Sequence, residues 1–309
     1  MKAYIAKRLL FLIPLLFIVS FLAFSLVNLT SKDPAGDILR AQGYPAFTEE
    51  MVEQVKIEYG LDKPFLVRYF SWLSGAVHLD FGKSYIKGQS VSAMIFTALG
   101  YTMQLVGTTL ITVMLFALFF GILCTIFEGR ALDITVRIVL YIVAAMPAFW
   151  IATHAIWFFS NTLHWLPTSG VGSAAHFVMP TLVLSIGYFT FYFRMIRNSM
   201  LENVNENYVL FLRSSGVKEK RITLHVLRNS LQTAVAAFCM AIPGMMAGSV
   251  IIENVFAWPG IGRVCVSAIF SRDMPVILGY ILFMAVLYCC FNIFSDILNA
   301  ALNPRLRRS

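Results

Sequence analysis

The sequence predicts an all-α polytopic membrane protein with six transmembrane helices. Of its 309 residues, 59% are hydrophobic and only 13% are charged, about half the charged share of a typical soluble domain. Several apolar runs extend over about 20 residues, the length that crosses the hydrocarbon core of a bilayer as a helix. The charged residues gather between these runs, as expected of a multispan protein.

Six segments have the length and composition of membrane spans. The N-terminal run follows basic residues, as a signal peptide does, but it is too long for such a peptide and shows no small-residue cleavage site, which predicts a retained span. Gly244 and Gly248 form a small-xxx-small pair at which another helix could approach closely. The predicted spans are Leu9–Leu29, Thr102–Phe127, Val136–Phe159, His176–Phe193, Leu231–Ile252 and Val276–Leu298.

The basic residues predict the topology. They precede the first span (Lys2, Lys7, Arg8), close the chain, and outnumber acidic residues seven to three in Arg194–Asn229. The positive-inside rule therefore places both termini and this loop in the cytoplasm, and a net charge of +8 needs no nucleic-acid partner. Three regions result: 1–30 as the first transmembrane helix, 31–98 as an extracytoplasmic helical segment, and 99–309 as the main transmembrane domain.

The extracytoplasmic segment predicts short helices. Phe47–Tyr59 has helical spacing, with Thr48 as cap and acidic residues in the first turn. Leu66–Val77 repeats the helical pattern, and Asp80-Phe81-Gly82 indicates a turn. We expect a compact subdomain, which serves either as a packed cap or as a ligand-contacting surface.

Histidine and cysteine residues do not predict a metal site. His164 and His176 lie in one outer loop but are twelve residues apart without cysteine or carboxylate neighbours, which matches no zinc spacing. His154 lies inside the third span, where a titratable group more often faces a cavity than lipid. The five cysteines lie in or beside apolar runs and indicate small core residues.

The last outer loop supports two interpretations. Trp258-Pro259-Gly260 predicts a turn, Ile261–Phe270 a short amphipathic helix, and Ser271–Pro275 the entry to the sixth span. The helix is either interfacial, with Trp258 at headgroup level, or part of an external gate or partner platform. The residues for the second interpretation are Glu253, Trp258, Arg263, Arg272 and Asp273.

The polar stretch in mid-chain has a helical pattern of its own. Leu201, Val204 and Tyr208 fall at helical steps, Gly216 interrupts the pattern, and a second segment begins at Val217. It is either a connector that only sets topology or a docking surface for a soluble partner. The sequence contains no phosphate-binding G-x-x-x-x-G-K-[ST], no G-x-S-x-G and no H-E-x-x-H motif. We therefore expect no enzymatic activity, and energy for any uphill transport from another protein.

Read together, these segments resemble the permeases of ABC importers. Tyr208–Asn229 is similar to their coupling loop, in which E-A-A-x-x-x-G precedes a second helix; Gly216 matches the glycine, and Leu210-Phe211-Leu212 replaces Glu-Ala-Ala. The matches extend over the whole chain and indicate the dipeptide, oligopeptide and nickel branch. Within it, Ile251–Phe270 and Leu298–Arg305 most resemble the first nickel or metal-chelate permease. The further matches are Leu61–Pro64, Asp80–Ser84, Trp258–Arg263, Arg272–Val276 and Asn303–Arg305.

The resemblance implies a transport subunit of the bacterial inner membrane, surrounded by lipid. It would act with a second homologous permease, an extracytoplasmic solute-binding protein, and two ATPase subunits that bind ATP and Mg, while binding no cofactor itself. Its substrate would be nickel or a metal chelate; dipeptide or oligopeptide import, an ion-coupled secondary transporter and a non-transporting scaffold are the alternatives. The coupling loop would be residues 198–229, with contacts from Tyr208, Leu212, Arg213, Ser214, Gly216, Val217, His225 and Arg228.

Overall fold

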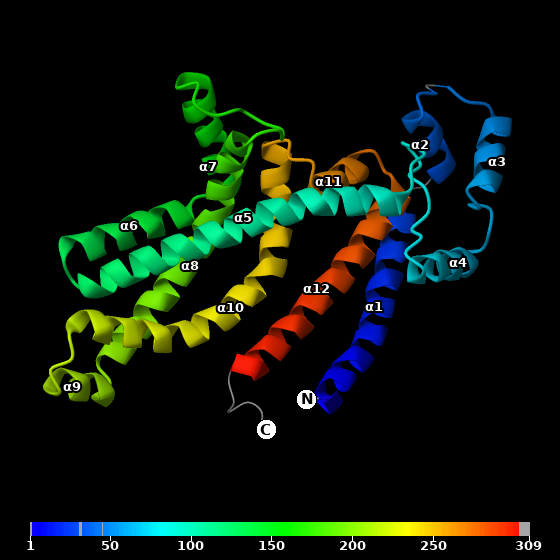
Figure 1. Cartoon of the computed structure of the whole chain (residues 1–309). Coiled ribbons are helices and arrows are strands. Elements are labelled where there is room, and N and C mark those ends of the chain that lie inside the picture. Colours follow the sequence, from blue (N-terminus) through cyan, green and yellow to red (C-terminus); the bar gives the residue numbers. More distant parts are fainter. Residues whose placement is uncertain (1, 31–32, 45, 303–309) are drawn as a thin grey trace. The chain divides into compact units, whose positions relative to one another are not determined.

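The computed structural model describes residues 2–30, 33–44 and 46–302, and its regular structure is helical (Figure 1). Within these residues, the β-type pairing consists of an isolated antiparallel bridge between Lys83 and Ser90. The helices are α1 (Lys2–Thr30), α2 (Pro34–Ala41), α3 (Glu49–Glu58), α4 (Phe65–Val77), α5 (Val91–Ile126), α6 (Ala131–Ala145), α7 (Ala148–Ala155), the π-helical η1 (Ile156–Thr162), α8 (Ala174–Val204), α9 (Asn207–Ser214), α10 (Glu219–Val255), α11 (Ile261–Phe270) and α12 (Met274–Leu302).

The chain forms two compact units. The first contains the residues up to 102 together with 259–293, and the second contains 103–258 together with the residues from 294 on. Helices α5 and α12 therefore contribute to both units. The short helices α2–α4 and the helix α11 belong to the first unit, whereas α6–α10 belong to the second.

An aromatic cluster fixes α4 against α1 in the first unit. Tyr69 of α4 is fully buried, and its ring contacts those of Phe21 and Phe24 at centroid distances of 5.3 and 5.5 Å. The Tyr69 hydroxyl pairs with Ser20 Oγ at 2.9 Å, so its polar end is also satisfied. α4 consequently runs crosswise to the C-terminal half of α1 (Figure 1).

Close packing of α8 and α10 organises the second unit. The Tyr192 ring of α8 stacks on Phe238 of α10 at 4.0 Å, and its hydroxyl donates to the Ala237 carbonyl at 2.7 Å. A Cβ atom at Gly244 or Gly248 would lie 3.3 or 3.5 Å from the Tyr188 hydroxyl. At both glycines the neighbouring α8 atoms belong to side chains, so the predicted close approach of another helix stays a prediction.

The predicted short helices are confirmed at α3, α4 and α11. Thr48 caps α3, because its Oγ1 accepts a hydrogen bond from the Met51 backbone N–H at 3.4 Å. The sequence reasoning missed α2, which begins at Pro34 after the capping residue Asp33. A proline at the first helical position and an aspartate before it are both helix-start signals.

Several predicted spans have different limits in the structure. α5 starts at Val91 rather than Thr102, and α8 continues to Val204 rather than ending at Phe193. The third predicted span is broken at Met146 and Pro147, where two helices meet at 101°. Proline removes a backbone donor and drives the preceding residue to extended geometry, and Met146 has ψ 141°.

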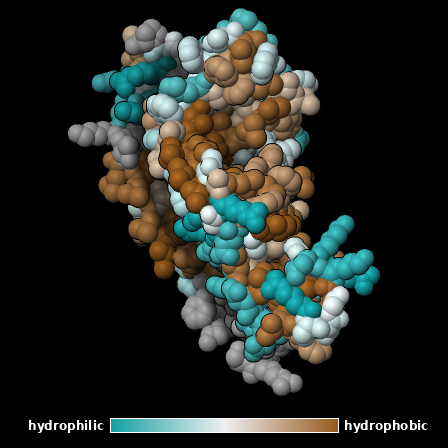
Figure 2. Space-filling model, turned by 90° about the vertical axis from the view of Figure 1, so that its left-hand side faces the viewer, coloured by the Kyte–Doolittle hydropathy of each residue, from teal (hydrophilic) through white to brown (hydrophobic). Residues whose placement is uncertain are grey.

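The described residues contain four helices long and apolar enough to cross a membrane, or five if the bent pair counts as one span. The fifth predicted span lies in α10, whose apolar part, Met240–Val255, is shorter. On the side shown in Figure 2, hydrophobic residues form a broad area, and hydrophilic residues gather at its upper left and toward the lower right. Hydrophobic helix surfaces joined by polar connecting segments are typical of a polytopic membrane protein.

Candidate functional site

Gly216 ends α9 with a tight turn that leads into α10. Its φ is +74°, a left-handed conformation that glycine adopts without the strain of a Cβ. The Gly216 N–H donates to the Arg213 carbonyl at 3.0 Å, and the Val217 N–H to the Leu212 carbonyl at 3.1 Å. This pair of bonds is the Schellman motif, which satisfies the last carbonyl groups of a helix. Gly216, which the sequence pattern predicted to interrupt a helix, therefore does end one.

The α9–α10 hairpin (residues 207–229) has a buried inner side and an exposed apolar tip. Val209 of α9 and both Ile222 and Val226 of α10 are buried. Leu210 and Phe211 are each 69% exposed. Because two large apolar side chains at a helix surface lose water on docking, this tip is suited to a partner's groove.

Of the other predicted coupling residues, Arg213 and Ser214 make polar side-chain contacts near this tip. Arg213 pairs with Glu219 across the turn, with Nε and Oε1 3.0 Å apart. Ser214 Oγ donates to the Phe211 carbonyl at 2.9 Å. Tyr208, Leu212 and Val217 are half-buried, whereas His225 and Arg228 are exposed on α10. Leu212 and Tyr208 were predicted to contact the ATPase, whereas the more exposed Leu210 and Phe211 were not.

A buried ion pair that the sequence did not reveal holds the segment before the hairpin. The Arg197 guanidinium of α8 donates from Nε and Nη2 to the two carboxylate oxygens of Asp133, both at 2.8 Å. Asp133, in the first turn of α6, is fully buried. It also accepts from the Gly129 N–H at 3.1 Å, and Arg137 Nε lies 3.3 Å away. The α5–α6 turn is thereby fixed to α8.

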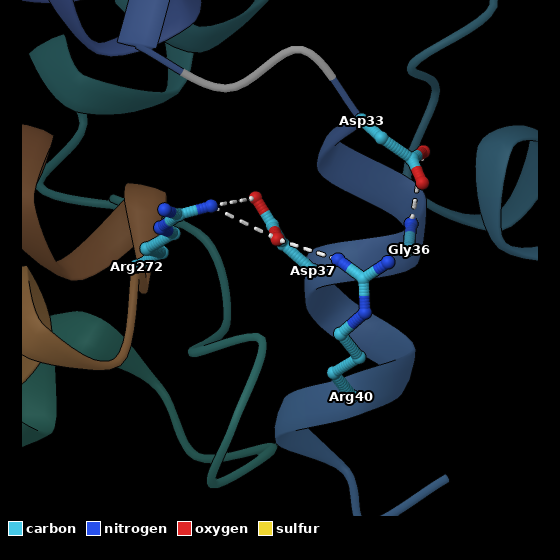
Figure 3. Close-up of polar contacts among 5 residues, drawn as sticks. All are labelled: Asp33, Gly36, Asp37, Arg40 and Arg272. Atoms are coloured by element: carbon cyan, nitrogen blue, oxygen red, sulfur yellow. Dashed lines mark hydrogen bonds and ion pairs between the residues drawn. The ribbon is translucent and has the colours of Figure 1, made fainter. Parts of the chain in front are cut away.

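The two predicted outer residues that precede α12 have separate partners in the first unit. Arg272 Nη1 lies 3.1 and 3.0 Å from the two oxygens of Asp37, in the first turn of α2 (Figure 3). Arg40 approaches the same carboxylate at 3.4 Å, while Asp33 caps α2 at the Gly36 N–H. This network fixes α2 to the connection between α11 and α12.

Asp273 is buried and anchors the loop before α5. Its carboxylate accepts from the Ser84 hydroxyl and, at 3.1 Å, from the Tyr85 backbone N–H. Burial raises the pKa of Tyr85 to about 12; Arg68 opposes this shift and Asp273 adds to it. The phenol therefore stays neutral at physiological pH.

Glu253 and Trp258 are buried in the second unit, so they differ from the exposed outer residues. Glu253 accepts from Ser249 Oγ at 2.9 Å, and the Trp258 ring meets Phe177 at 4.6 Å. Trp258 is fully buried, so its ring does not face the surroundings as an interfacial anchor would. Of the five predicted outer residues, Arg263 and Arg272 are the exposed ones.

Two family descriptions match the chain over nearly its whole length. Residues 117–308 match "Binding-protein-dependent transport system inner membrane component", and residues 1–106 match the N-terminal region of such membrane components. The chain belongs to this family. It is a permease subunit of an ABC importer and a multi-pass protein of the bacterial inner membrane. It is thus a transport component rather than a catalyst.

Relatives in this transport family cover the chain from end to end. The metal-staphylopine import system permease CntB of Staphylococcus aureus is 43% identical over 307 residues, covering 99% of both chains. The oligopeptide transport system permease AppB of Bacillus subtilis is 33% identical over 318 residues, with the same coverage. An inward-facing structure of the MetNI methionine ABC transporter shares the fold, with a TM-score of 0.55 and 16% identity over 68% of this chain and 96% of that one.

Two of the three histidines near the predicted outer loop, His154 and His176, have local partners. His154 lies against Trp150, with ring centroids 3.8 Å apart, and His176 Nδ1 accepts from the Ser173 N–H at 3.2 Å. His164 is exposed with a φ of +55°. Among the described residues there is no group of three or more histidine, cysteine or carboxylate side chains placed to hold a metal.

Proposed function

We propose that this permease forms, with a second homologous permease, the path for nickel or a metal chelate delivered by an extracytoplasmic binding protein. Two separate ATPase subunits, which bind ATP and Mg, would drive it through the α9–α10 hairpin. The observation that carries this proposal is the exposed Leu210–Phe211 tip on a short helix ended by Gly216.

The hairpin has the properties that a lever requires. The Schellman turn fixes the end of α9, Val209 is buried under it, and Arg213 pairs with Glu219 across the turn. When a groove on the ATPase holds Leu210 and Phe211 and then moves, the displacement passes into α8 and α10. Because α8 is bonded to the α5–α6 turn through Arg197 and Asp133, these helices would move together.

The proposed topology has six spans, with α10 as the fifth and with both termini and the hairpin in the cytoplasm. The distribution of basic residues supports it. The polar stretch 194–229, which contains the hairpin, has seven basic and three acidic residues, whereas the segment 31–98 has seven basic and eight acidic residues. The segment 31–98 would then lie outside, where Arg263 and Arg272 can contact the binding protein. The buried Asp273 would support this outer face from within the first unit, and the buried Glu253 and Trp258 would do the same for the second unit.

A metal chelate is the substrate that the relatives favour. The metal-staphylopine permease is 43% identical to the chain, against 33% for the oligopeptide permease, both over 99% of each chain. Peptide import by the same mechanism is the second candidate, supported by that 33% relative.

Purification of the transporter from native membranes with its partners, followed by transport assays in proteoliposomes, tests this proposal. We expect an ATPase pair and a solute-binding protein to copurify, and radioactive nickel supplied with a chelator to enter only when ATP is present on the ATPase side. A di- or oligopeptide that competes for entry would favour the second candidate. Uptake that continues without ATP but stops when the proton gradient is dissipated would refute the ABC mechanism.

A further inference from the structure

The side of α4 turned away from α1 exposes four large apolar side chains, together with Ser71 and Ser74. Leu66, Val67, Phe70 and Val77 are between 51% and 74% exposed, and their spacing places them on one side of the helix. The opposite side carries the buried Tyr69 and packs on α1. A short helix with apolar residues on both sides and few charges is unusual at a water-exposed surface.

Apolar side chains are also exposed at the end of the first span. Leu29, in the last turn of α1, is 80% exposed, and Leu26 one turn earlier is 63% exposed. α1 is one of the helices apolar enough to cross the membrane. Because α4 runs crosswise to α1 (Figure 1), it has the orientation of a helix lying in the membrane interface.

A cavity of about 530 Å³ opens where α1, α2, α3 and α4 meet. Two cationic side chains, Lys56 and Arg68, line it together with the apolar Leu29 and Phe65, and its lining contains no carboxylate. The volume lies within the range of about 300–1,000 Å³ typical of small-ligand sites. Its full lining is Ser25, Asn28, Leu29, Pro34, Ala35, Lys56, Leu61, Phe65 and Arg68.

Arg68 is positioned in this cavity without a neutralising partner. Its Nη2 donates to Asn28 Oδ1 at 2.7 Å, and the Asn28 amide in turn donates to the Phe24 carbonyl at 2.7 Å. In the part of the chain that the structure describes, no carboxylate lies within ion-pair distance of Arg68. The neutral Asn28 amide therefore orients the guanidinium and leaves its charge available for an anion.

We propose that this cavity binds the phosphate of a phospholipid headgroup, through Arg68 and Lys56, with the acyl chains along α1 and the exposed side of α4. The Arg68 guanidinium and the Lys56 ammonium both line the cavity, and each can donate charge-assisted hydrogen bonds to the anionic oxygens of a phosphate diester. The exposed apolar side chains of Leu26, Leu29 and Phe70 favour a lipid over a soluble anion, which would leave them in water. The lipid would fix α4 in the leaflet that the C-terminal end of α1 reaches, whichever substrate is transported.

Native mass spectrometry of the full-length permease with its partner subunits tests this site. Dioleoylphosphatidylglycerol is titrated into the complex in neutral detergent and compared with dioleoylglycerol, which lacks the phosphate, and with glycerol 3-phosphate, which lacks the tails. We expect phosphatidylglycerol to bind at least about tenfold more tightly than either probe, because only it supplies both charge-assisted hydrogen bonds and apolar contact.

Four variants assign this binding to the cavity. Arg68→Gln and Lys56→Gln should each weaken phosphatidylglycerol binding about three- to tenfold, whereas Lys56→Arg should retain it. Lys87→Gln, which removes an exposed charge outside the cavity lining, should bind as the wild type does. Lys56 is half-exposed, with a weak contact to Glu53 at 3.7 Å, so its replacement is compatible with normal folding.

Two results would overturn the proposal. Unchanged phosphatidylglycerol binding in both Lys56→Gln and Arg68→Gln would show that the cavity is not the site. Equal affinity for glycerol 3-phosphate and phosphatidylglycerol would show that it holds a soluble anion rather than a lipid.

Discussion

Asp133 has a buried carboxylate that joins α8 to the α5–α6 turn in the second unit. Its two oxygens are satisfied by Arg197 and by the Gly129 N–H. Removal of one partner of a buried pair leaves an uncompensated charge and costs about 3–5 kcal/mol. We therefore expect Asp133→Ala to lower the thermal unfolding temperature of the purified permease strongly, as followed by differential scanning fluorimetry.

Two comparisons separate this effect from a general loss of charge. The double variant Asp133→Ala/Arg197→Leu should recover much of the stability, because the more deeply buried Arg197 charge is removed together with its partner and the remaining Arg137 side chain is 35% exposed. Glu219→Gln breaks the exposed pair with Arg213 and should change stability by less than about 1 kcal/mol. A single Asp133→Ala variant as stable as Glu219→Gln would contradict the role assigned to the buried pair.

Arg272 and Asp273 are neighbours in sequence but should differ in their contribution to stability. Arg272 makes an ion pair whose guanidinium side is 58% exposed, so Arg272→Ala should cost less than about 1 kcal/mol. Asp273→Ala leaves the buried Ser84 hydroxyl and the Tyr85 N–H without their acceptor, at a cost of about 1–3 kcal/mol. Parallel thermal unfolding of the two variants measures the difference, and equal losses would contradict this ranking.

At the scale of elements, Gly216 permits a test of the hairpin that involves conformation alone. Its φ is +74°, and a Cβ built there would meet no atom within 4 Å. Gly216→Val should therefore strain the backbone by about 1–2 kcal/mol without a steric clash and distort the end of α9. We expect reduced substrate uptake with ATP hydrolysis retained, measured in the same proteoliposomes.

The matched control for this prediction is Gly216→Asn. Asparagine adopts positive φ more readily than other non-glycine residues, so this variant should keep most of the coupling between hydrolysis and uptake. Normal uptake by Gly216→Val, at wild-type expression, would mean that the turn does not transmit the motion.

The sequence predicted the elements with strong local signals and missed those that depend on tertiary contacts. Thr48, Gly216 and the Trp258–Gly260 turn mark α3, α9 and α11, because caps and turn residues act over a few residues. The Asp133–Arg197 pair joins residues 64 positions apart, and no local pattern links them. α8 was predicted too short for the same reason: its polar last turns are stabilised by that pair and by packing on α10.

The candidate site was predictable to a similar degree. The hairpin and its glycine could be predicted from the helical pattern of the sequence and from the family resemblance. Which of its side chains are exposed could not be predicted from the pattern. Leu210 and Phe211 could have been selected because they replace polar or small residues of the family motif. The burial of Glu253 and Trp258 could not, since charge and turn chemistry gave them the signature of an outer loop.

At the scale of the whole molecule, the break at Pro147 determines the topology. If α6 and α7 form one bent span, the chain crosses the membrane three times between residues 87 and 220, through α5, the bent pair and α8. If the pair instead enters and leaves on one side, only two crossings remain. Residues 87 and 220 then lie on opposite sides in the first case and on the same side in the second.

Labelling with a membrane-impermeant maleimide distinguishes these two topologies. Lys87 and Lys220 are both exposed, and each is replaced by cysteine in a background in which the native cysteines are changed to serine or alanine. We expect Lys87→Cys to react in intact cells and Lys220→Cys to react only after the membrane is permeabilised, because the positive-inside distribution places the hairpin in the cytoplasm. Labelling of both positions in intact cells would make α6–α7 a re-entrant pair and remove the hairpin from the reach of a cytoplasmic ATPase.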